Sequence, residues 1–477
     1  MKHPGLAAAL LVLALGPLAC TGGSSAKHDE AAVCVPPAPA ESHGAAPLEL
    51  QVLGTLAVGT RVGFTVPANA ASVTVIEQLV AGSLTVTLPG GSVVPNAATP
   101  LRIEDPSGAV VLDRTVDPVD PTQAKLFFRS TAPGTGAVTL PNSSAGLQLV
   151  SSGVPGGPWT LTVSDLAHLC TVQPGRCAAG SASAAGRYAV TVIVKPGSGA
   201  ANIPAAGALD VTLNLVPAGL TPPLSAATAA TDPHVQRFVQ TLGTLLGQAG
   251  ISLGAVRYVD VPAATAADVA GGVPVDDTTA CAPLSRLFLT APAGRQVNVF
   301  LVGSLYSPQQ PGAVLLGYDG EIPGPATLSP TAQSGVIVSA ADLRVPANPS
   351  GGGLSVYCGV TPSYASCGAD RTAYLAAHEI GHHLGLYHPT EQHGTAFDPL
   401  VDTASCACQA CASDVAQCEG ASPAPASPHS MTVAECSAGG SCGGGDNLMF
   451  WVLDSRHATG LLTAEQGRVL RASPAVY

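Results

Sequence analysis

The sequence is poor in charged residues, which make up 10% of its 477 positions against about 25% in an average globular protein. Coiled coils and long solvated helices need charged faces, so this composition excludes coiled coils and predicts few long solvated helices. Basic residues are especially few, with 19 Lys and Arg against 31 Asp and Glu and a formal net charge of −12. Because phosphate binding needs clustered Lys and Arg, we expect no nucleic-acid partner.

Long apolar runs are also missing, since no stretch reaches the ~18 apolar residues of a membrane-spanning helix. Residues 6–15 form a shorter apolar run behind Lys2, which is the layout of a signal peptide. The run ends in Gly-Pro-Leu-Ala-Cys20, which resembles the lipobox of bacterial lipoproteins. This resemblance implies a signal peptide at 1–19 and a lipidated Cys20. The expected location is the outer membrane or cell surface, with the lipid as the sole membrane contact, or the extracellular space if cleavage occurs without lipidation.

Glycine and proline, in contrast, are abundant, with 54 and 42 residues, so turns must be frequent. The hydrophobic fraction of 46% matches a globular chain with a sizeable core and excludes a largely disordered one.

Cysteine occurs thirteen times, an odd number. With Cys20 acylated, twelve would remain for up to six disulfides in an oxidising compartment. Six cysteines fall between 406 and 442, where the Cys-x-Cys-x-x-Cys spacing would suit a second zinc ion in a reducing cytosol. The signal peptide favours disulfides instead. The expected local pairs elsewhere are Cys170 with Cys177 and Cys358 with Cys367.

The chain divides into regions of different pattern. A Ser- and Pro-rich stretch at 20–47 predicts a flexible tether after the lipidated cysteine. Short β-type runs separated by turns predict an all-β sandwich or jelly-roll domain at 48–195, acting as a binding module or as a spacer. A Gly- and Pro-containing linker at 196–208 follows. Residues 209–477 mix strand-like and helical patterns, which predicts an α+β domain with a mixed sheet.

The strongest chemical signal is the segment 378–388, which reads His-Glu-Ile-Gly-His-His-Leu-Gly-Leu-Tyr-His. Residues 370–384 lack proline and favour a helix, with Asp370 as the predicted N-cap. On a helix His378 and His382 share one face, as two ligands of one metal ion must. Gly385 would end the helix in a left-handed conformation and let His388 return as the third ligand. Three imidazoles with one open position indicate a catalytic zinc site.

These residues resemble the metzincin zinc metallopeptidases, and the segment 398–403 with the following cysteine resembles the pappalysin-like branch. The resemblance implies a Met-turn at Met449, within Asp-Asn-Leu-Met. It also implies a substrate-binding edge strand at 313–318 and a neighbouring strand at 336–339. The chain departs from the pattern at Trp451, where many members have Tyr. Asp398 and Asp402 are expected to bind Ca²⁺ or to orient their loop by hydrogen bonds.

The prediction is therefore an exported zinc-dependent endopeptidase that acts on protein or peptide substrates. Zinc would activate a water molecule, and Glu379 would act as general base. His383 and His393 are expected to have structural roles. The alternative is a non-enzymatic surface lipoprotein that binds a partner through its β-sandwich and uses zinc only structurally.

Overall fold

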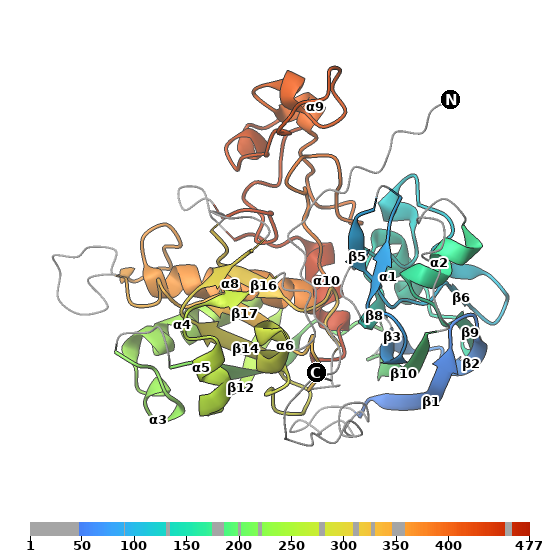
Figure 1. The fold of residues 1–477 in the computed structure, drawn as a ribbon, viewed down its shortest axis with the longest axis horizontal. Helices are drawn as coiled ribbons and strands as arrows, with labels where there is room; N and C mark the ends of the chain where they lie inside the picture. The colour runs from blue at the N-terminus through green and yellow to red at the C-terminus, as the bar shows by residue number, and fades with distance from the viewer. Residues whose placement is uncertain are drawn as a thin grey trace.

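The computed structural model describes residues 47–89, 91–129, 134–173, 186–198, 202–217, 222–275, 282–308, 314–325, 330–345, 358–453 and 460–477. The signal peptide, the predicted lipidation site Cys20 and the tether lie outside these residues. Within them, no helix has both the length and the apolar character that a membrane crossing requires. The fold is a mixed α/β arrangement with several sheets (Figure 1).

Two four-stranded antiparallel sheets form the N-terminal part. Their inward side chains meet in one hydrophobic core, with Phe64 and Trp159 from one sheet and Val75 and Val192 from the other. The first sheet has the order β1 (Glu49–Ala57), β10 (Arg187–Pro196), β3 (Ala70–Ala81), β8 (Thr135–Leu140). The second has the order β2 (Arg61–Val66), β9 (Gly157–Thr162), β6 (Arg102–Glu104), β7 (Val110–Asp113). A small hairpin joins β4 (Thr85–Thr87) to β5 (Val93–Pro95).

The prediction of an all-β domain at 48–195 is wrong, because this part also contains helices. It contains the helices α1 (Ser144–Ser151) and α2 (Leu166–Val172) and a 3-10 turn, Pro121–Gln123. The side chains of Ser143 and Asp165 accept hydrogen bonds from the first-turn backbone N–H groups of α1 and α2. These N-caps stabilise helices too short to show a clear apolar period in the sequence.

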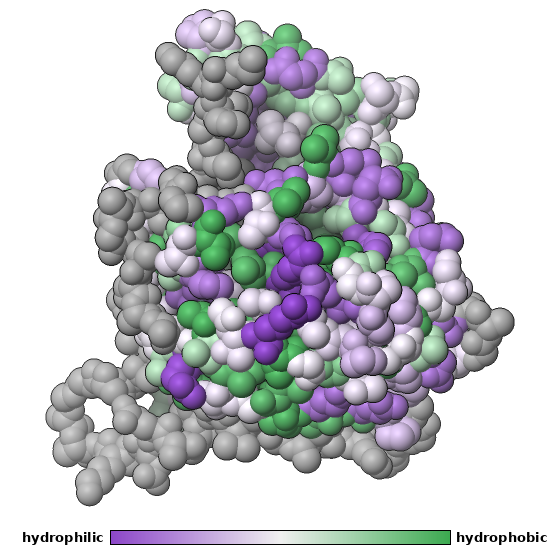
Figure 2. Space-filling model, turned by 90° about the vertical axis from the view of Figure 1, so that its right-hand side faces the viewer, coloured by the Kyte–Doolittle hydropathy of each residue, from purple (hydrophilic) through white to green (hydrophobic). Residues whose placement is uncertain are grey.

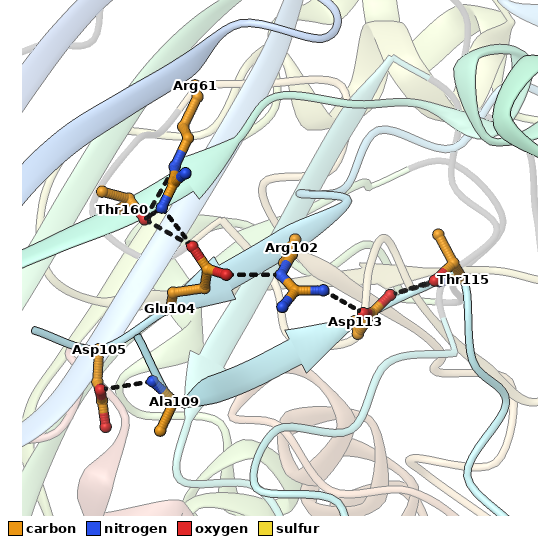
Figure 3. Close-up of polar contacts among 8 residues, drawn as sticks. All are labelled: Arg61, Arg102, Glu104, Asp105, Ala109, Asp113, Thr115 and Thr160. Atoms are coloured by element: carbon orange, nitrogen blue, oxygen red, sulfur yellow. Dashed lines mark hydrogen bonds and ion pairs between the residues drawn. The ribbon is translucent and has the colours of Figure 1, made fainter. Parts of the chain in front are cut away.

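The second sheet carries a ladder of charged side chains across β2, β6 and β7 (Figure 3). Arg61 bonds Glu104, and Arg102 joins Glu104 to Asp113 at 2.8 Å on each side. Two arginines face two carboxylates, so the ladder has no net charge.

Figure 2 shows a hydrophilic cluster at the centre of one face of the molecule, surrounded by pale and apolar residues.

The C-terminal part is built on a five-stranded mixed sheet with the order β12 (Ile251–Asp260), β11 (Gly207–Leu215), β14 (Val297–Val302), β17 (Val336–Ser339), β16 (Gly317–Asp319). The first four strands are parallel, and β16 is an antiparallel edge strand. The predicted strand at 336–339 is confirmed. The predicted edge strand at 313–318 is shifted, because regular pairing begins only at Gly317 and residue 313 lies outside the described residues.

Helices cover both faces of this sheet (Figure 1). Alternate residues of β14 explain how: Val299 and Leu301 enter the core under α4 (Pro233–Gly247) and α8 (Gly368–His383), while Phe300 enters the core on the opposite face. That opposite face is covered by α5 (Ala263–Asp268), α6 (Pro283–Phe288) and the pair β13 (Val273–Pro274) and β15 (Leu305–Tyr306).

Helix α8 begins earlier than predicted, because Cys367 is the N-cap and Asp370 lies inside the first turn. Asp370 is fully buried and receives hydrogen bonds from Arg237 Nε at 2.7 Å and Nη2 at 2.9 Å. The carboxylate therefore joins α8 to α4 instead of capping its own helix.

The end of α8 follows the prediction. Gly385 has φ +112°, a conformation that residues with a Cβ rarely adopt. The Leu386 N–H donates to the Gly381 carbonyl and the Gly385 N–H to the His382 carbonyl. These two bonds form a Schellman motif, which ends the helix and turns the chain back toward it.

A cysteine-rich segment extends from the body of the molecule around α9 (Cys408–Cys411), as Figure 1 shows. It contains the 3-10 turns Val415–Gln417 and Glu435–Ser437. Its six cysteines pair as Cys406–Cys436, Cys408–Cys418 and Cys411–Cys442. The prediction of disulfides over a second zinc site is confirmed here. Cys358–Cys367 is also a disulfide, and Cys170 is disulfide-bonded, whereas Cys177 lies outside the described residues.

Candidate metal centre

Three histidine side chains converge where α8 meets the loop that follows it. The Nε2 atom of His382 lies 3.1 Å from that of His378 and 3.0 Å from that of His388, and the remaining pair is 3.3 Å apart. Tetrahedral Zn²⁺ with bonds of about 2.0–2.1 Å requires nitrogen atoms about 3.3–3.4 Å apart. Within the described parts of the chain, this is the one group of three or more His, Cys, Asp or Glu placed to hold a metal ion. The donor set thus fits the predicted ion, although it does not identify the metal.

The other ring nitrogen of each histidine has its own acceptor. His378 Nδ1 lies 2.8 Å from the Leu448 carbonyl, and His382 Nδ1 lies 2.8 Å from the Leu386 carbonyl. His388 Nδ1 lies 2.9 Å from Glu391 Oε2. With Nδ1–H donating, Nε2 carries the free lone pair that a metal requires. Burial lowers the pKa of His378 to about 3 and that of His382 well below its usual value, which keeps both rings neutral.

Glu379 lies beside the three histidines in a cavity of 550 Å³. The residue is 8% exposed, and burial, reinforced by Asp319, raises the pKa of its carboxyl group well above the usual value. A divalent cation held nearby would favour the ionised form again. The carboxylate fits against the edge strand only because Gly317 has no side chain, since a Cβ there would lie 2.4 Å from Glu379 Oε1. The group predicted as general base is therefore held between α8 and β16.

Met449 packs against α8 at Gly381, the residue before His382. It is fully buried, and a Cβ added to Gly381 would stand 2.4 Å from its sulfur atom. The Met449 N–H donates to Asn447 Oδ1, and the preceding Leu448 carbonyl accepts from His378. The turn predicted around Met449 thus contacts α8 directly and supports one ligand by hydrogen bonding.

Trp451, at the position where the resemblance would place Tyr, donates from Nε1 to the Met431 carbonyl at 2.9 Å. Met431 belongs to the small core of the cysteine-rich segment, against which Trp451 packs. The indole therefore connects that segment to the chain beyond Met449. Trp451 also lines the cavity.

Two further residues beside the ligand group were not among the predicted site residues. Glu391 lies three residues after His388, and its carboxylate accepts from His388 Nδ1. Arg129, which belongs to the N-terminal part, forms an ion pair with Glu391, with Arg129 Nη1 3.1 Å from Glu391 Oε1. Burial raises the Glu391 pKa, but His388 and Arg129 together outweigh burial and hold it below its usual value. The spacing of Glu391 was a local signal that could have been noticed, whereas no sequence pattern indicates Arg129.

Asp398 and Asp402 are engaged in hydrogen bonds within the protein. Asp398 accepts from Thr403 Oγ1 at 2.5 Å and from the Leu400 N–H. Asp402 accepts from Thr463 Oγ1 and from the Glu465 N–H, at the first turn of α10 (Ala464–Ala472). These contacts match the loop-orienting role. No group of three carboxylates that could hold calcium occurs in the described residues.

The other two histidines near the motif have partners elsewhere. His383 is buried with its Nδ1 2.9 Å from Asp319, and burial lowers its pKa to about 4. His393 Nδ1 lies 2.9 Å from the His429 carbonyl. Neither histidine is part of the ligand group.

Comparison of the chain with protein-family models and with curated protein sequences finds no match. The metzincin resemblance therefore stays a prediction, carried by the three histidines, Glu379 and Met449.

Proposed function

We propose that the chain is an exported zinc-dependent endopeptidase. The observation that carries the proposal is that one cavity contains both the three Nε2 atoms, whose lone pairs are free for a metal ion, and the buried carboxylate of Glu379. His378, His382 and His388 would hold the ion, and a bound Zn²⁺ supplies a Lewis acid and lowers the pKa of water.

The chain's own residues perform the remaining steps. A peptide lying along β16 would place its scissile carbonyl near the histidines, since β16 is the edge of the mixed sheet and lines the cavity. Glu379 would take a proton from the attacking water and pass it to the leaving amine. Burial of Glu379 excludes bulk water from that carboxylate, which strengthens its interaction with the developing charges.

The test is Glu379→Gln, which keeps the size and shape of the side chain but cannot accept the proton. We expect unchanged zinc content, measured by atomic absorption, and a loss of at least about 100-fold in cleavage of a peptide library. The peptidase proposal is overturned if the wild-type protein holds one zinc ion but cleaves no more peptide than the variant does. That result would favour the alternative, a non-enzymatic lipoprotein. Glu379 supports the enzyme, because a structural metal site needs no base.

Export with lipidation at Cys20 is part of the same proposal. The disulfides support an oxidising compartment. Mass spectrometry of the mature N-terminus should find an acylated Cys20, and an unmodified N-terminus at another residue contradicts lipidation.

A further inference from the structure

The loop that carries the third histidine is held from outside the mixed-sheet part of the molecule. His388 is not on α8, so the helix cannot fix its position as it fixes His378 and His382. The neighbouring residues Tyr387 and Glu391 both contact the segment 127–129, more than 250 positions earlier in the chain. This segment lies between the 3-10 turn Pro121–Gln123, which follows β7, and the strand β8.

The first contact is apolar. The rings of Phe127 and Tyr387 meet edge to face, with centroids 5.0 Å apart and planes at 89°. Both rings are buried and, with Ile322, form a small core of their own. Asn142 fixes the backbone of Phe127, because its side chain accepts from the Phe127 N–H at 2.9 Å and donates to the Phe127 carbonyl at 2.6 Å.

The second contact is ionic. Arg129 Nη1 donates to Glu391 Oε1 at 3.1 Å, while Glu391 Oε2 holds His388 Nδ1. The Glu391 side chain is 8% exposed and the Arg129 side chain 29%. The Arg129 guanidinium also stacks over the Phe127 ring, with its carbon 5.3 Å from the ring centroid. The two contacts therefore form one cluster on both sides of His388.

We infer that Phe127 and Arg129 are positioning residues of the metal centre, which hold the loop 386–391 so that His388 completes the ligand group. A metal-bound histidine whose Nδ1–H donates to a carboxylate gains basicity and a fixed orientation, and that carboxylate itself needs orienting. Arg129 orients Glu391, and Phe127 packs against the residue before His388. The N-terminal part is then a component of the metal centre and not a separate spacer.

The inference rests on the metal-binding part of the proposed function and not on peptide hydrolysis. Its test should avoid changing the charge near the ion, because loss of a cation would by itself favour a divalent metal. Arg129→Lys keeps the charge but loses the planar fork. Phe127→Leu keeps apolar bulk but loses the edge-to-face contact.

Matched controls exist in the same protein. Arg468→Lys changes an arginine of α10 that donates to Ser151 and Leu147 of α1, a contact between the same two parts that does not involve the histidine loop. Phe64→Leu changes an aromatic pair with Trp159 inside the N-terminal core.

The measurements are the Zn²⁺ dissociation constant, by competition with a chelator, and the visible spectrum of the Co²⁺-loaded protein. We expect Arg129→Lys and Phe127→Leu to weaken Zn²⁺ binding about 10-fold and to alter the Co²⁺ spectrum, because second-shell changes have effects of this size. Both controls should bind Zn²⁺ within about twofold of wild type. Circular dichroism of each metal-free variant verifies that it is folded.

Two results would overturn the inference. One is wild-type affinity and an unaltered Co²⁺ spectrum in both loop variants. The other is an equal loss in Arg468→Lys and Phe64→Leu, which would indicate a general effect of destabilisation. If the wild-type protein binds no metal, both this inference and the peptidase proposal are wrong. If the wild-type protein binds Zn²⁺ but cleaves no peptide, and the loop variants bind Zn²⁺ more weakly, then this inference is supported and only the peptidase proposal is wrong.

Discussion

At the scale of single residues, the site depends on one position where a side chain is missing. Gly317 on β16 gives Glu379 the space its carboxylate occupies, so a methyl group there would displace the carboxylate by an ångström or more. Gly317 lies in a regular antiparallel pair with Val338, and no unusual backbone conformation requires glycine there. The steric demand therefore comes from Glu379.

Gly317→Ala should lower kcat/KM for peptide cleavage about 100-fold, because displacing a catalytic group by about 1 Å costs about that much. Zinc content should not change, since the three atoms nearest to the added Cβ all belong to Glu379. The matched control is Gly63→Ala on β2, where the nearest atom to the new Cβ would be 3.7 Å away. Full activity in Gly317→Ala contradicts the assignment of Glu379.

Asp398 provides a pH-dependent effect that does not involve the metal. Burial raises its pKa to about 7, against 3.8 for the unperturbed carboxyl. Between these values the folded protein holds a proton that the unfolded chain has released. The free energy of unfolding therefore decreases as the pH rises through this window, by up to about 1.4 kcal/mol per pH unit.

Asn cannot titrate, so Asp398→Asn should remove this contribution. Relative to wild type, the variant should gain roughly 2–3 kcal/mol in stability between pH 5 and pH 8. Urea denaturation of both proteins across that range measures the difference. Parallel pH profiles would show that Asp398 is ionised in the folded protein at pH 5.

At the scale of elements, α8 is fixed at both ends. Its last turn ends in the Schellman motif, and its first turn is joined to α4 by the buried pair of Arg237 and Asp370. Asp370 also accepts from Thr241 Oγ1 at 2.5 Å and from the Ser363 N–H at 2.8 Å. A fully satisfied carboxylate at a helix N-terminus is stabilised by the helix dipole as well.

Removing the arginine leaves the buried carboxylate without its cation. Arg237→Met should therefore lower the free energy of unfolding by about 3–5 kcal/mol. The control is Arg286→Met, whose partner Asp268 forms an exposed pair at 3.4 Å and should contribute at most about 1 kcal/mol. Urea denaturation measures both variants. Equal effects would mean that burial does not distinguish the two pairs.

The cysteine-rich segment also stabilises the chain that follows Met449. Its three disulfides enclose a small core that includes Met431 and Phe450. Phe450 directly follows Met449, and Trp451 is hydrogen-bonded to Met431. The cross-linked segment thus supports the turn around Met449.

At the scale of the whole molecule, the N-terminal and C-terminal parts share one core. A single hydrophobic cluster includes residues of the N-terminal sheets, of the mixed sheet and of α4, α8 and α10. Lys195 of β10 is buried, and its Nζ donates to the carbonyls of Arg471, Ser473 and Val476. Figure 1 shows α10 between the two sheet regions.

We therefore expect the two parts to unfold together. The chain has two tryptophans, Trp159 in β9 and Trp451 beside the metal centre. Trp451→Phe leaves a fluorescent probe in the N-terminal part, and Trp159→Phe leaves one in the C-terminal part. In each variant the fluorescence and far-UV circular dichroism transitions in urea should coincide. Separate transitions would show independent domains.

The sequence by itself determined the features that arise within one segment. The spacing of His378, His382 and Gly385 follows from the helical repeat and the left-handed conformation that ends it, so the pattern predicts the ligands directly. The strand at 336–339 was expected from the metzincin resemblance, and the disulfides of the cysteine-rich segment were expected from the number of cysteines together with the signal peptide. Local reasoning was less accurate at boundaries, as the shifted edge strand and the N-cap of α8 show.

Only the tertiary structure decided how that segment is supported. Arg129 is 262 positions from Glu391, Arg237 is 133 from Asp370, and Gly317 lies on another strand from the carboxylate it accommodates. Such contacts follow from how sheets and helices pack, and no periodic pattern in the chain encodes them. Hydrogen bonding and close packing, which act over a few ångströms in space, join residues that are far apart in sequence.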